Sequence, residues 1–459
     1  MTNNLLQTLA QIVGAEHAST ADSVRRLHSE DQSSHALVLP DVVVWPDSTE
    51  QVSQIAKYAH DNGIAITGWG AGSSLEGNSV PLQAGIVIDF GRMNNIVAVH
   101  ENDFQVTVQP GIFYRDMNES LSRYGLFFAP DPGANASIGG MVANNAAGTR
   151  TVRYGATRDN VLALEVVLAT GEVIQTGSRS VKQSAGYDLT HLFTGSEGTL
   201  GLITQATLKL HPLPEHFSAV LATFEDTSAA ADAVYGIMGS GLNPAALEML
   251  DAEAIGYMNR LETVNLPEET TLLMEFHGAS RATLAAELEI VQQVCQECSA
   301  MSFEAGVGRD ERNRLWEGRH ALGEVLFRAY PDSTYLITDV SVPISEYPTL
   351  ATYAKGLQQE NQIIGTLFGH AGDGNLHTTN FAPKDDSEKW AVLQDFNDRV
   401  VQKAIELGGT CTGEHGIGIG KQKYMVYEHG EGAVDVMRQI KQLFDPNNIL
   451  NPGKVVALG

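Results

Sequence analysis

Short apolar runs separated by turn residues mark the first half of the chain. Residues 41–45 predict a buried strand, and apolar residues at helical spacing over 52–59 predict a helix that ends at Gly63. Further strands are expected at 64–67 and 85–90. A strand with alternating apolar residues is predicted over 202–210.

The pattern changes near Ser218, where strands begin to alternate with amphipathic helices. Strands are predicted at 272–276 and 335–342, and each precedes a predicted helix, at 283–298 and 345–359. This order favours an antiparallel sheet with helices on one face, so the predicted fold class is α+β.

Composition and charge narrow the class of protein. A chain of 459 residues is too long for a single core and predicts two domains, or one domain with a large cap. Its 43% hydrophobic and 18% charged residues are typical of a globular protein. The net charge of −26 argues against nucleic acid or an anionic membrane surface as the main partner.

Targeting signals and cysteines point to the cytoplasm. The first residues lack a signal-peptide pattern, and no apolar run reaches the ~20 residues that a transmembrane helix needs. Cys295 and Cys298 lie in a helical pattern without a second pair, which indicates helix packing rather than a zinc or redox motif. We therefore expect a cytoplasmic protein.

Three segments of small residues suggest a nucleotide-binding site. A glycine-rich loop at 68–74 follows a predicted strand, and such a loop can bring backbone N–H groups onto a diphosphate. It leads into another strand, whereas a Rossmann loop opens a helix. The segments 130–149 and 194–201 are similarly poor in bulky residues. Close chain packing explains one such segment well, but it explains three poorly.

Together these segments resemble the FAD-binding domain of the vanillyl-alcohol oxidase superfamily, the p-cresol methylhydroxylase type, over about residues 38–213. The resemblance implies that the first loop cradles the pyrophosphate of FAD and that the other segments line the cofactor. Ser73 stands where some members carry a histidine that binds FAD covalently, so non-covalent FAD is expected. The implied cofactor-binding residues are Gly68, Trp69, Gly70, Ala71, Gly72, Ser73, Ser74, Pro130, Gly133, Ser137, Gly140, Asn144, Gly148, Glu197, Gly198 and Ile203.

Candidate chemistry in the second half is concentrated in two glycine-rich motifs. One carries His370 and His377, and the other carries Glu414 and His415. Two imidazoles and a carboxylate are typical ligands of a divalent transition metal, although spacing alone does not exclude ordinary surface or core histidines.

Both motifs resemble the signature segments of the FAD-linked oxidase C-terminal family, which includes D-lactate, D-2-hydroxyglutarate and glycolate enzymes. The resemblance implies that His370, His377 and Glu414 bind a metal and that His415 is the catalytic base. It also implies that Arg319 binds the substrate carboxylate and that Asn451 lies near the flavin. Zinc is the expected metal, with manganese or iron(II) as alternatives.

The resemblance implies a division into an FAD-binding domain (1–213), a cap domain for substrate and metal (214–425), and a C-terminal segment that returns to the FAD domain (426–459). The expected reaction oxidises a D-2-hydroxy acid to a 2-oxo acid, with hydride transfer to flavin N5. By alignment, Ile337 and Gly323 replace a lysine and a threonine that hold the second carboxylate in the hydroxyglutarate branch. D-lactate is therefore the expected substrate.

Other functions stay open from the sequence. The chain could instead be a D-2-hydroxyglutarate dehydrogenase, or a flavin subunit that works inside a glycolate oxidase complex. A metallohydrolase with a merely structural glycine-rich half is an alternative of another class, and a pure binding module is the least favoured. NAD is not expected as electron acceptor because the Rossmann fingerprint is missing, which leaves a quinone, a cytochrome or an electron-transfer flavoprotein. Such an acceptor could bring the enzyme to the inner membrane, and a homodimer is one option for its assembly.

Overall fold

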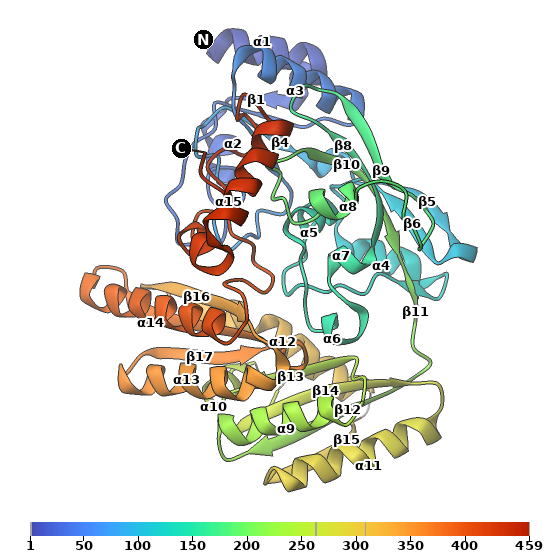
Figure 1. The fold of residues 1–459 in the computed structure, drawn as a ribbon, viewed down its shortest axis with the longest axis vertical. Coiled ribbons are helices and arrows are strands. Elements are labelled where there is room, and N and C mark those ends of the chain that lie inside the picture. Colours follow the sequence, from blue (N-terminus) through green and yellow to red (C-terminus); the bar gives the residue numbers. More distant parts are fainter. Residues whose placement is uncertain (1, 262–263, 308, 459) are drawn as a thin grey trace. The chain divides into compact units, whose positions relative to one another are not determined.

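The computed structural model describes residues 2–261, 264–307 and 309–458, and the chain forms two compact units (Figure 1). The first unit consists of Met1–Ala147, Ala156–Leu213 and Glu414–Gly459. The second consists of Gly148–Gly155 and Pro214–Gly413. These are units of packing; the functional division at 213 and 425 stays a prediction.

A four-stranded sheet in the order β1-β2-β4-β3 begins the first unit. Its strands are β1 (Ala18–Ser19), β2 (Val42–Val44), β3 (Ile66–Trp69) and β4 (Ile86–Asp89). β4 pairs in parallel with β2 and β3, and β2 is buried along its whole length, as parallel strands covered on both faces are. A bridge between Ile66 and Leu450 joins the C-terminal segment to β3.

An antiparallel sheet in the order β5-β6-β10-β8-β9 forms the rest of this unit's framework. Its strands are β5 (Ile96–His100), β6 (Gln105–Val108), β8 (Val161–Val167), β9 (Val173–Gly177) and β10 (Leu202–Lys209), beside the short pair β7 (Leu126–Phe127) and β11 (His211–Pro212). Met141 and Val142 of α5 pack against Val166 and Leu208 of this sheet in one buried cluster.

Helices surround these sheets within the first unit. They are α1 (Thr2–Val13), α2 (Asp22–Leu27), α3 (Thr49–Asn62), α4 (Tyr114–Ser122), α5 (Ile138–Asn144), α7 (Thr157–Asn160), α8 (Leu189–Phe193) and α15 (Met425–Phe444), with single turns η1 (Ala15–His17), η2 (Phe90–Arg92), η3 (Glu101–Asp103) and η6 (Gln422–Tyr424). α3 ends as the sequence predicts, because Gly63 adopts a left-handed conformation with φ 63°.

The second unit is built on a seven-stranded sheet in the order β15-β12-β14-β13-β17-β18-β16, and every neighbouring pair is antiparallel (Figure 1). The strands are β12 (His216–Phe224), β13 (Ala246–Leu250), β14 (Thr270–Gly278), β15 (Ser302–Val307), β16 (Ser333–Ser341), β17 (Ile364–Gly369) and β18 (Asn375–Pro383). The antiparallel sheet with helices that the sequence predicts is therefore present.

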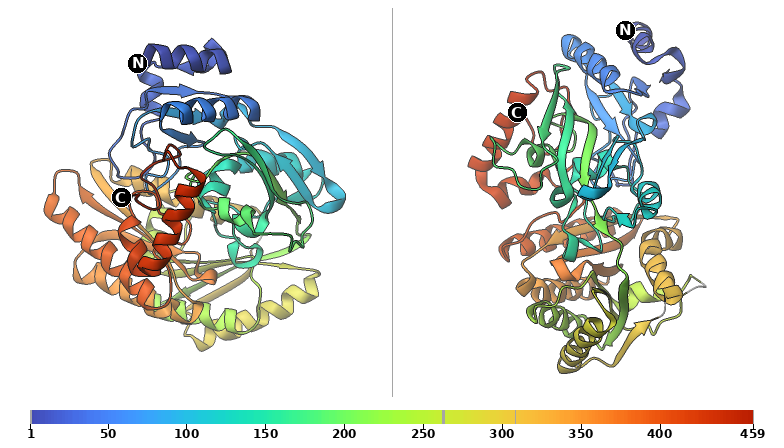
Figure 2. Two further views of the ribbon diagram at one scale, coloured as in Figure 1. Left: turned by 45° about the horizontal axis from the view of Figure 1, so that its top comes forward. Right: turned by 90° about the vertical axis from the view of Figure 1, so that its right-hand side faces the viewer.

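Helices cover both faces of this sheet, so the prediction of a single covered face is wrong (Figure 2). The helices are α6 (Thr151–Tyr154), α9 (Thr227–Gly239), α10 (Ala252–Met258), α11 (Arg281–Glu297), α12 (Arg309–Ala329), α13 (Tyr347–Glu360) and α14 (Ser387–Glu406), with turns η4 (Ile344–Glu346) and η5 (Ala371–Asp373). Phe381 packs in a cluster with α10 and α12, while its neighbour Asn380 binds Gln358 of α13. Successive strand residues point to opposite faces, which places the two helix layers on opposite sides.

Among the residues that the structure describes, every helix is too short or too polar to traverse a lipid bilayer.

Candidate active site

One face of the second unit's sheet carries a row of side chains that includes the predicted metal ligand His377. Asp339 of β16 pairs with His377 of β18, and His377 pairs with Phe368 of β17. Paired residues share a face, so these three side chains lie on the side of the sheet that α12 covers. Glu248 of β13 lies on the same face, because Ala246 and Leu250, two residues before and after it in the strand, pack in the cluster that contains α12.

Glu248 joins two of the predicted site residues. Its Oε1 lies 2.6 Å from Nδ1 of His370, and its Oε2 lies 2.7 Å from Nε and 2.6 Å from Nη2 of Arg319. Burial raises the pKa of this carboxyl, but the charges of His370 and Arg319 lower it more, so the pKa lies below its ordinary value. Arg319 is buried (7% exposed), and its guanidinium lies 4.9 Å from the ring of Phe368. The structure therefore holds Arg319 in a fixed orientation.

The two predicted metal-binding histidines lie together at the ends of neighbouring strands. The ring centres of His370 and His377 are 5.2 Å apart, with the ring planes at 86°. Each Nδ1 faces a buried carboxylate, Glu248 for His370 at 2.6 Å and Asp339 for His377 at 3.6 Å. Histidines that bind metals through Nε2 are usually oriented in this way by a carboxylate at the other ring nitrogen. The pair therefore fits a metal site.

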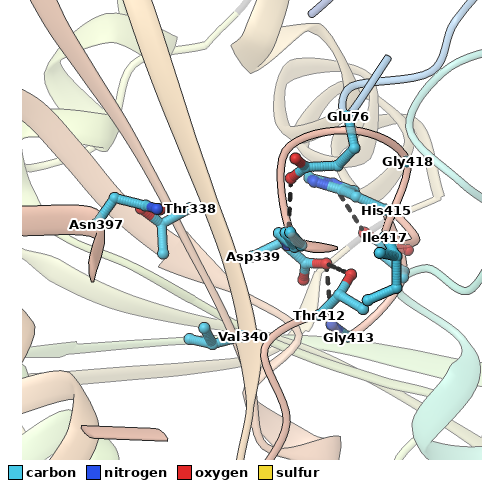
Figure 3. Close-up of polar contacts among 12 residues, drawn as sticks. Glu76, Thr338, Asp339, Val340, Asn397, Thr412, Gly413, His415, Ile417 and Gly418 are labelled. Atoms are coloured by element: carbon cyan, nitrogen blue, oxygen red, sulfur yellow. Dashed lines mark hydrogen bonds and ion pairs between the residues drawn. The ribbon is translucent and has the colours of Figure 1, made fainter. Parts of the chain in front are cut away.

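Asp339 also fixes the segment that leads to the third predicted ligand. Its Oδ2 accepts hydrogen bonds from the hydroxyl of Thr412 at 2.8 Å and from the N–H of Gly413 at 2.9 Å (Figure 3). A side chain at Gly413 would collide with Asn375, because a Cβ there would lie 2.2 Å from its Nδ2. Glu414 follows directly, where the chain passes from the second unit into the first. The tight approach explains the glycine before Glu414.

The first unit brings the predicted FAD-binding segments together. A Cβ on Gly70 would lie 2.2 Å from Oγ of Ser137, which shows that the first loop touches the start of α5. The N–H of Glu197 donates to the carbonyl of Ala143 in α5 at 2.8 Å. Asn451 donates to the carbonyls of Asn78 and Glu197 at 2.9 and 2.7 Å. Gly148 is the exception among the predicted cofactor residues, because it belongs to the second unit.

Glu197 has a role that the sequence did not predict. This residue is buried, and its carboxylate accepts hydrogen bonds from the N–H groups of Ile417 at 2.6 Å and Gly418 at 2.9 Å. Asn78 donates a third hydrogen bond at 2.7 Å. Burial raises the pKa of Glu197 more than these donors lower it, so the pKa lies above its ordinary value. The carboxylate therefore clamps the turn that follows His415.

His415 itself is held through its backbone. Its carbonyl accepts hydrogen bonds from the amides of Asn78 at 3.4 Å and Asn144 at 3.3 Å. Gly416 adopts φ 81°, and a Cβ there would come within 2.8 Å of both Asn78 and Glu197. Glycine is thus required at this position for conformation and for space. These contacts fix the backbone from which the His415 side chain projects.

Some features of the first unit fit a bound dinucleotide. Oδ1 of Asn78 and Oγ of Ser79 are buried just after the first glycine-rich loop, and neither atom has a hydrogen-bond partner among the described residues. Such atoms are usually satisfied by a ligand or by water. Gly133 has an ordinary backbone conformation, and a Cβ there would meet no atom within 4 Å. Packing therefore does not explain Gly133, whereas a cofactor lying against the backbone would.

Sequence reasoning missed Glu248 as a site residue. The signal was present, since Glu248 is a single acidic residue in the apolar run 245–250. A buried charge is costly unless it is paired, so such a position predicts a partner. The partner, Arg319, lies 71 residues away in sequence, and no local pattern identifies it.

Solved structures show which fold the chain has. The chain superimposes on 4-ethylphenol oxidase from Gulosibacter chungangensis with a TM-score of 0.81, covering 99% of this chain and 97% of that one at 19% identity. p-Cresol methylhydroxylase gives a TM-score of 0.76 over 99% of this chain and 97% of that one, at 17% identity. The fold is therefore that of the p-cresol methylhydroxylase type, as predicted.

The chain belongs to the FAD-linked oxidase family. Residues 213–455 match the family model described as FAD linked oxidases, C-terminal domain, and residues 40–177 match that of an FAD binding domain. The probable mitochondrial D-lactate dehydrogenase of Danio rerio is 38% identical over 99% of this chain and 92% of its own. The mitochondrial D-lactate dehydrogenase [cytochrome] of Arabidopsis thaliana is 39% identical over 96% and 78%, and glycolate oxidase subunit GlcD of Bacillus subtilis is 37% identical over 100% and 97%. This membership confirms the predicted family and argues against the metallohydrolase.

Proposed function

We propose that this FAD-dependent enzyme oxidises D-lactate to the corresponding 2-oxo acid. The observation that carries the proposal is the cluster of Glu248, Arg319 and His370, in which a buried guanidinium lies beside an oriented pair of histidines. A guanidinium is suited to a carboxylate, and an imidazole pair is suited to a hydroxyl or a metal. D-lactate dehydrogenases among the full-length relatives support the choice of acid.

Arg319 is the proposed substrate carboxylate ligand. Glu248 occupies Nε and one N–H of Nη2, so the edge formed by Nη1 and the second N–H of Nη2 is the part suited to a substrate carboxylate. Two parallel hydrogen bonds from that edge would orient the α-hydrogen of the acid. FAD, when bound, supplies the acceptor of that hydrogen as hydride.

His415 is the proposed base that accepts the hydroxyl proton. A neutral imidazole titrates close to neutral pH, which suits proton abstraction under cellular conditions. Its backbone is held at the carbonyl by Asn78 and Asn144, and the turn after it is held by Glu197. This anchoring supports the role, because a general base must keep a constant position relative to its substrate.

We also propose a divalent metal bound by His370, His377 and Glu414. The carboxylates behind both imidazoles support the histidines as ligands. Glu414 is attached to Gly413, whose N–H is bound by the same Asp339 that faces His377. A metal there would lower the pKa of the substrate hydroxyl. Zinc is the first candidate for this set, with manganese or iron(II) as alternatives.

Two residues of the second unit, one in β16 and one in α12, bear on the length of substrate that the site can accept. Ile337 lies two residues before Asp339 in β16 and therefore projects from the same face. A Cβ on Gly323, in α12, would meet no atom within 4 Å. Neither position offers a hydrogen-bond donor to a second carboxylate, which would cost roughly 1–3 kcal/mol if that carboxylate were buried unpaired. A short side chain such as that of lactate is therefore favoured over hydroxyglutarate.

The alternative is a flavin subunit that acts on glycolate within a complex, as the name of the Bacillus subtilis relative suggests. The relatives named for a cytochrome favour a cytochrome as acceptor, ahead of a quinone or an electron-transfer flavoprotein. We propose that FAD is bound without a covalent link, since Ser73 offers no imidazole for one. A cytoplasmic location stays a prediction.

An anaerobic titration of the oxidised flavin tests the proposal. D-lactate should bleach the flavin absorbance, and L-lactate, glycolate and D-2-hydroxyglutarate should bleach it far less. Treatment with a chelator should abolish the bleaching, and acid denaturation should release the yellow cofactor into solution. A yellow protein that glycolate bleaches and D-lactate does not would favour the alternative. Flavin that stays oxidised with all four acids would refute the proposed substrate class.

A further inference from the structure

We propose that Glu248 is a positioning residue of this reaction, because a single buried carboxylate sets both the tautomer of His370 and the orientation of Arg319. The inference rests on the proposed function, in which these two residues bind the metal and the substrate carboxylate. Glu248 is 0% exposed and lies in the middle of β13, so it acts through the two residues it binds and does not itself face a ligand.

The tautomer follows from the hydrogen bond to His370. Oε1 of Glu248 lies 2.6 Å from Nδ1, and an ionised carboxylate can only accept a hydrogen bond. Nδ1 therefore carries the hydrogen, and in the neutral ring Nε2 keeps its lone pair. A metal ion requires that lone pair. The same contact fixes the ring plane, so Glu248 selects both the nitrogen that binds metal and the direction in which it points.

The other carboxylate oxygen fixes the arginine. Oε2 accepts from Nε and Nη2 of Arg319, and the ring of Phe368 lies against the guanidinium at 4.9 Å. One edge and one face of the guanidinium are thereby occupied, which leaves the edge formed by Nη1 and Nη2 for a substrate carboxylate. Movement of Glu248 would therefore displace the substrate-binding edge and the metal-binding nitrogen together.

Glutamine cannot keep both contacts without changing the tautomer of His370. Its amide has one accepting oxygen, so when that oxygen binds Arg319, the NH₂ group donates to Nδ1 of His370 and the ring hydrogen moves to Nε2. When the oxygen binds His370 instead, the NH₂ group faces the N–H donors of Arg319. The Glu248→Gln variant keeps the size of the side chain and loses either the metal-binding tautomer of His370 or the contact with Arg319. It should therefore weaken metal binding, substrate binding or both, whereas the predicted FAD-binding residues other than Gly148 belong to the first unit and should be unaffected.

Asp251 provides a matched control from the same part of the sheet. It is also buried (1% exposed), and it accepts hydrogen bonds from Lys355 at 2.8 Å and from the N–H groups of Leu367 and Ala254 at 2.8 and 2.9 Å. None of these partners is a proposed site residue. Asp251→Asn therefore removes a buried charge at a comparable cost to folding without touching His370 or Arg319.

The experiment compares the wild type, Glu248→Gln and Asp251→Asn as full-length, FAD-loaded proteins. Zinc affinity is measured on metal-stripped protein by competition with a chromogenic chelator, and KM and kcat are measured for D-lactate. For Glu248→Gln we expect a zinc Kd raised about 10–100-fold and a KM raised about tenfold, with unchanged FAD content. For Asp251→Asn we expect a lower thermal midpoint with zinc Kd and KM within about twofold of wild type.

Three outcomes would decide the inference. Wild-type zinc Kd and KM in Glu248→Gln would refute it, and equal losses in Asp251→Asn would show that any buried charge in this sheet has the same effect. If Glu248→Gln does not fold, Glu248→Asp keeps the charge but is one methylene shorter, and an unchanged zinc Kd in that variant would also refute the inference. A wild type that binds zinc but is not bleached by D-lactate would instead refute the proposed function alone.

Discussion

Two buried glutamates, one in each unit, differ in the groups that compensate their charge. Glu197 and Glu248 are both buried, yet the pKa of Glu197 is raised and that of Glu248 is lowered. Glu197 is bound by neutral donors, the N–H groups of Ile417 and Gly418 and the amide of Asn78. Glu248 is bound by the guanidinium of Arg319 and by the imidazole of His370. Burial alone therefore does not determine the pKa of a carboxyl group.

The difference also separates what each carboxylate can organise. The N–H groups that bind Glu197 belong to the loop after His415, so Glu197 fixes the path of the chain around Gly416. It thereby fixes the backbone position from which the His415 side chain projects. Glu248 fixes the ends of two long side chains that come from separate elements, α12 and the end of β17. We call Glu197, its partners and His415 the first cluster, and Glu248 with Arg319 and His370 the second cluster. We expect changes in the first cluster to alter the rate of the chemical step and changes in the second cluster to alter the binding of metal and substrate.

The largest effect should come from His415→Ala, the direct test of the first cluster. Loss of a general base typically slows the chemical step by about 10²–10⁴-fold, so flavin reduction by D-lactate should slow by that amount. Stopped-flow absorbance under anaerobic conditions measures this rate. FAD content and zinc Kd serve as controls that the protein is intact. Full activity in a variant that passes both controls would remove His415 from the role of base.

A smaller effect is expected from Glu197→Gln, which weakens the clamp and leaves the imidazole in place. Loss of hydrogen bonds to a buried charge costs roughly 1–3 kcal/mol, and we expect flavin reduction to slow about tenfold with KM for D-lactate unchanged. A raised KM with an unchanged reduction rate would contradict the proposed separation of the two clusters. The contrast with Glu248→Gln, where KM should rise, is the sharpest form of the comparison.

The free energy of unfolding of Glu197→Gln, relative to that of the wild type, should also depend on pH. The sign of this dependence follows from the raised pKa of Glu197. Above the ordinary value of 4.5, the folded protein still binds a proton at Glu197 that the unfolded chain has released, so this group makes the wild type less stable as the pH rises. Glutamine does not titrate. The advantage of the wild type over Glu197→Gln in free energy of unfolding should therefore shrink as the pH rises from 4.5. Urea unfolding at several pH values measures it, and a growing advantage would contradict the assignment.

The smallest effect on activity is expected from Lys454→Met, beside the first cluster. Lys454 is buried, and burial lowers its pKa to about 8 although its amine donates to the carbonyl of Val80 at 2.6 Å. The unfolded chain holds this proton up to about pH 10.5, so the wild type gains stability relative to Lys454→Met between pH 8 and 10.5, by roughly 1–3 kcal/mol. Thermal unfolding across that range measures the gain, and a flat difference would show that the amine titrates normally.

Much of the fold could be predicted from the sequence because its elements have local signals. The glycine-rich loop at 68–74, the strand at 202–210 and the helix ending at Gly63 were all readable from spacing. The two covered faces of the second unit's sheet were not, since strands such as β14, buried on both faces, show no alternation that reveals which layer covers which side.

The site was predicted only in part, because only some of its residues belong to local sequence motifs. Glycine-flanked histidines form a local motif, so His370 and His377 were found together, and the structure adds the carboxylates behind them. Glu248 was missed, and Glu197 was predicted only as a cofactor residue, because each acts through a partner far away in sequence. The hydrogen bond from Ile417 to Glu197 spans 220 residues, and no periodicity records such a contact.

The hydrogen bond from Asn451 to Glu197 has a consequence for how the protein is made. The two residues are 254 positions apart, and a ribosome adding about 5–20 residues per second needs roughly 10–50 s to synthesise the stretch between them. Throughout that interval the Glu197 loop lacks Asn451, and for most of it the loop also lacks Ile417, which lies 220 residues after Glu197. Nascent chains stalled before residue 417 should therefore lack both the hydrogen bonds of Ile417 and Gly418 to Glu197 and the contact with Asn451, so this part of the first unit is completed only when the C-terminal segment has been made.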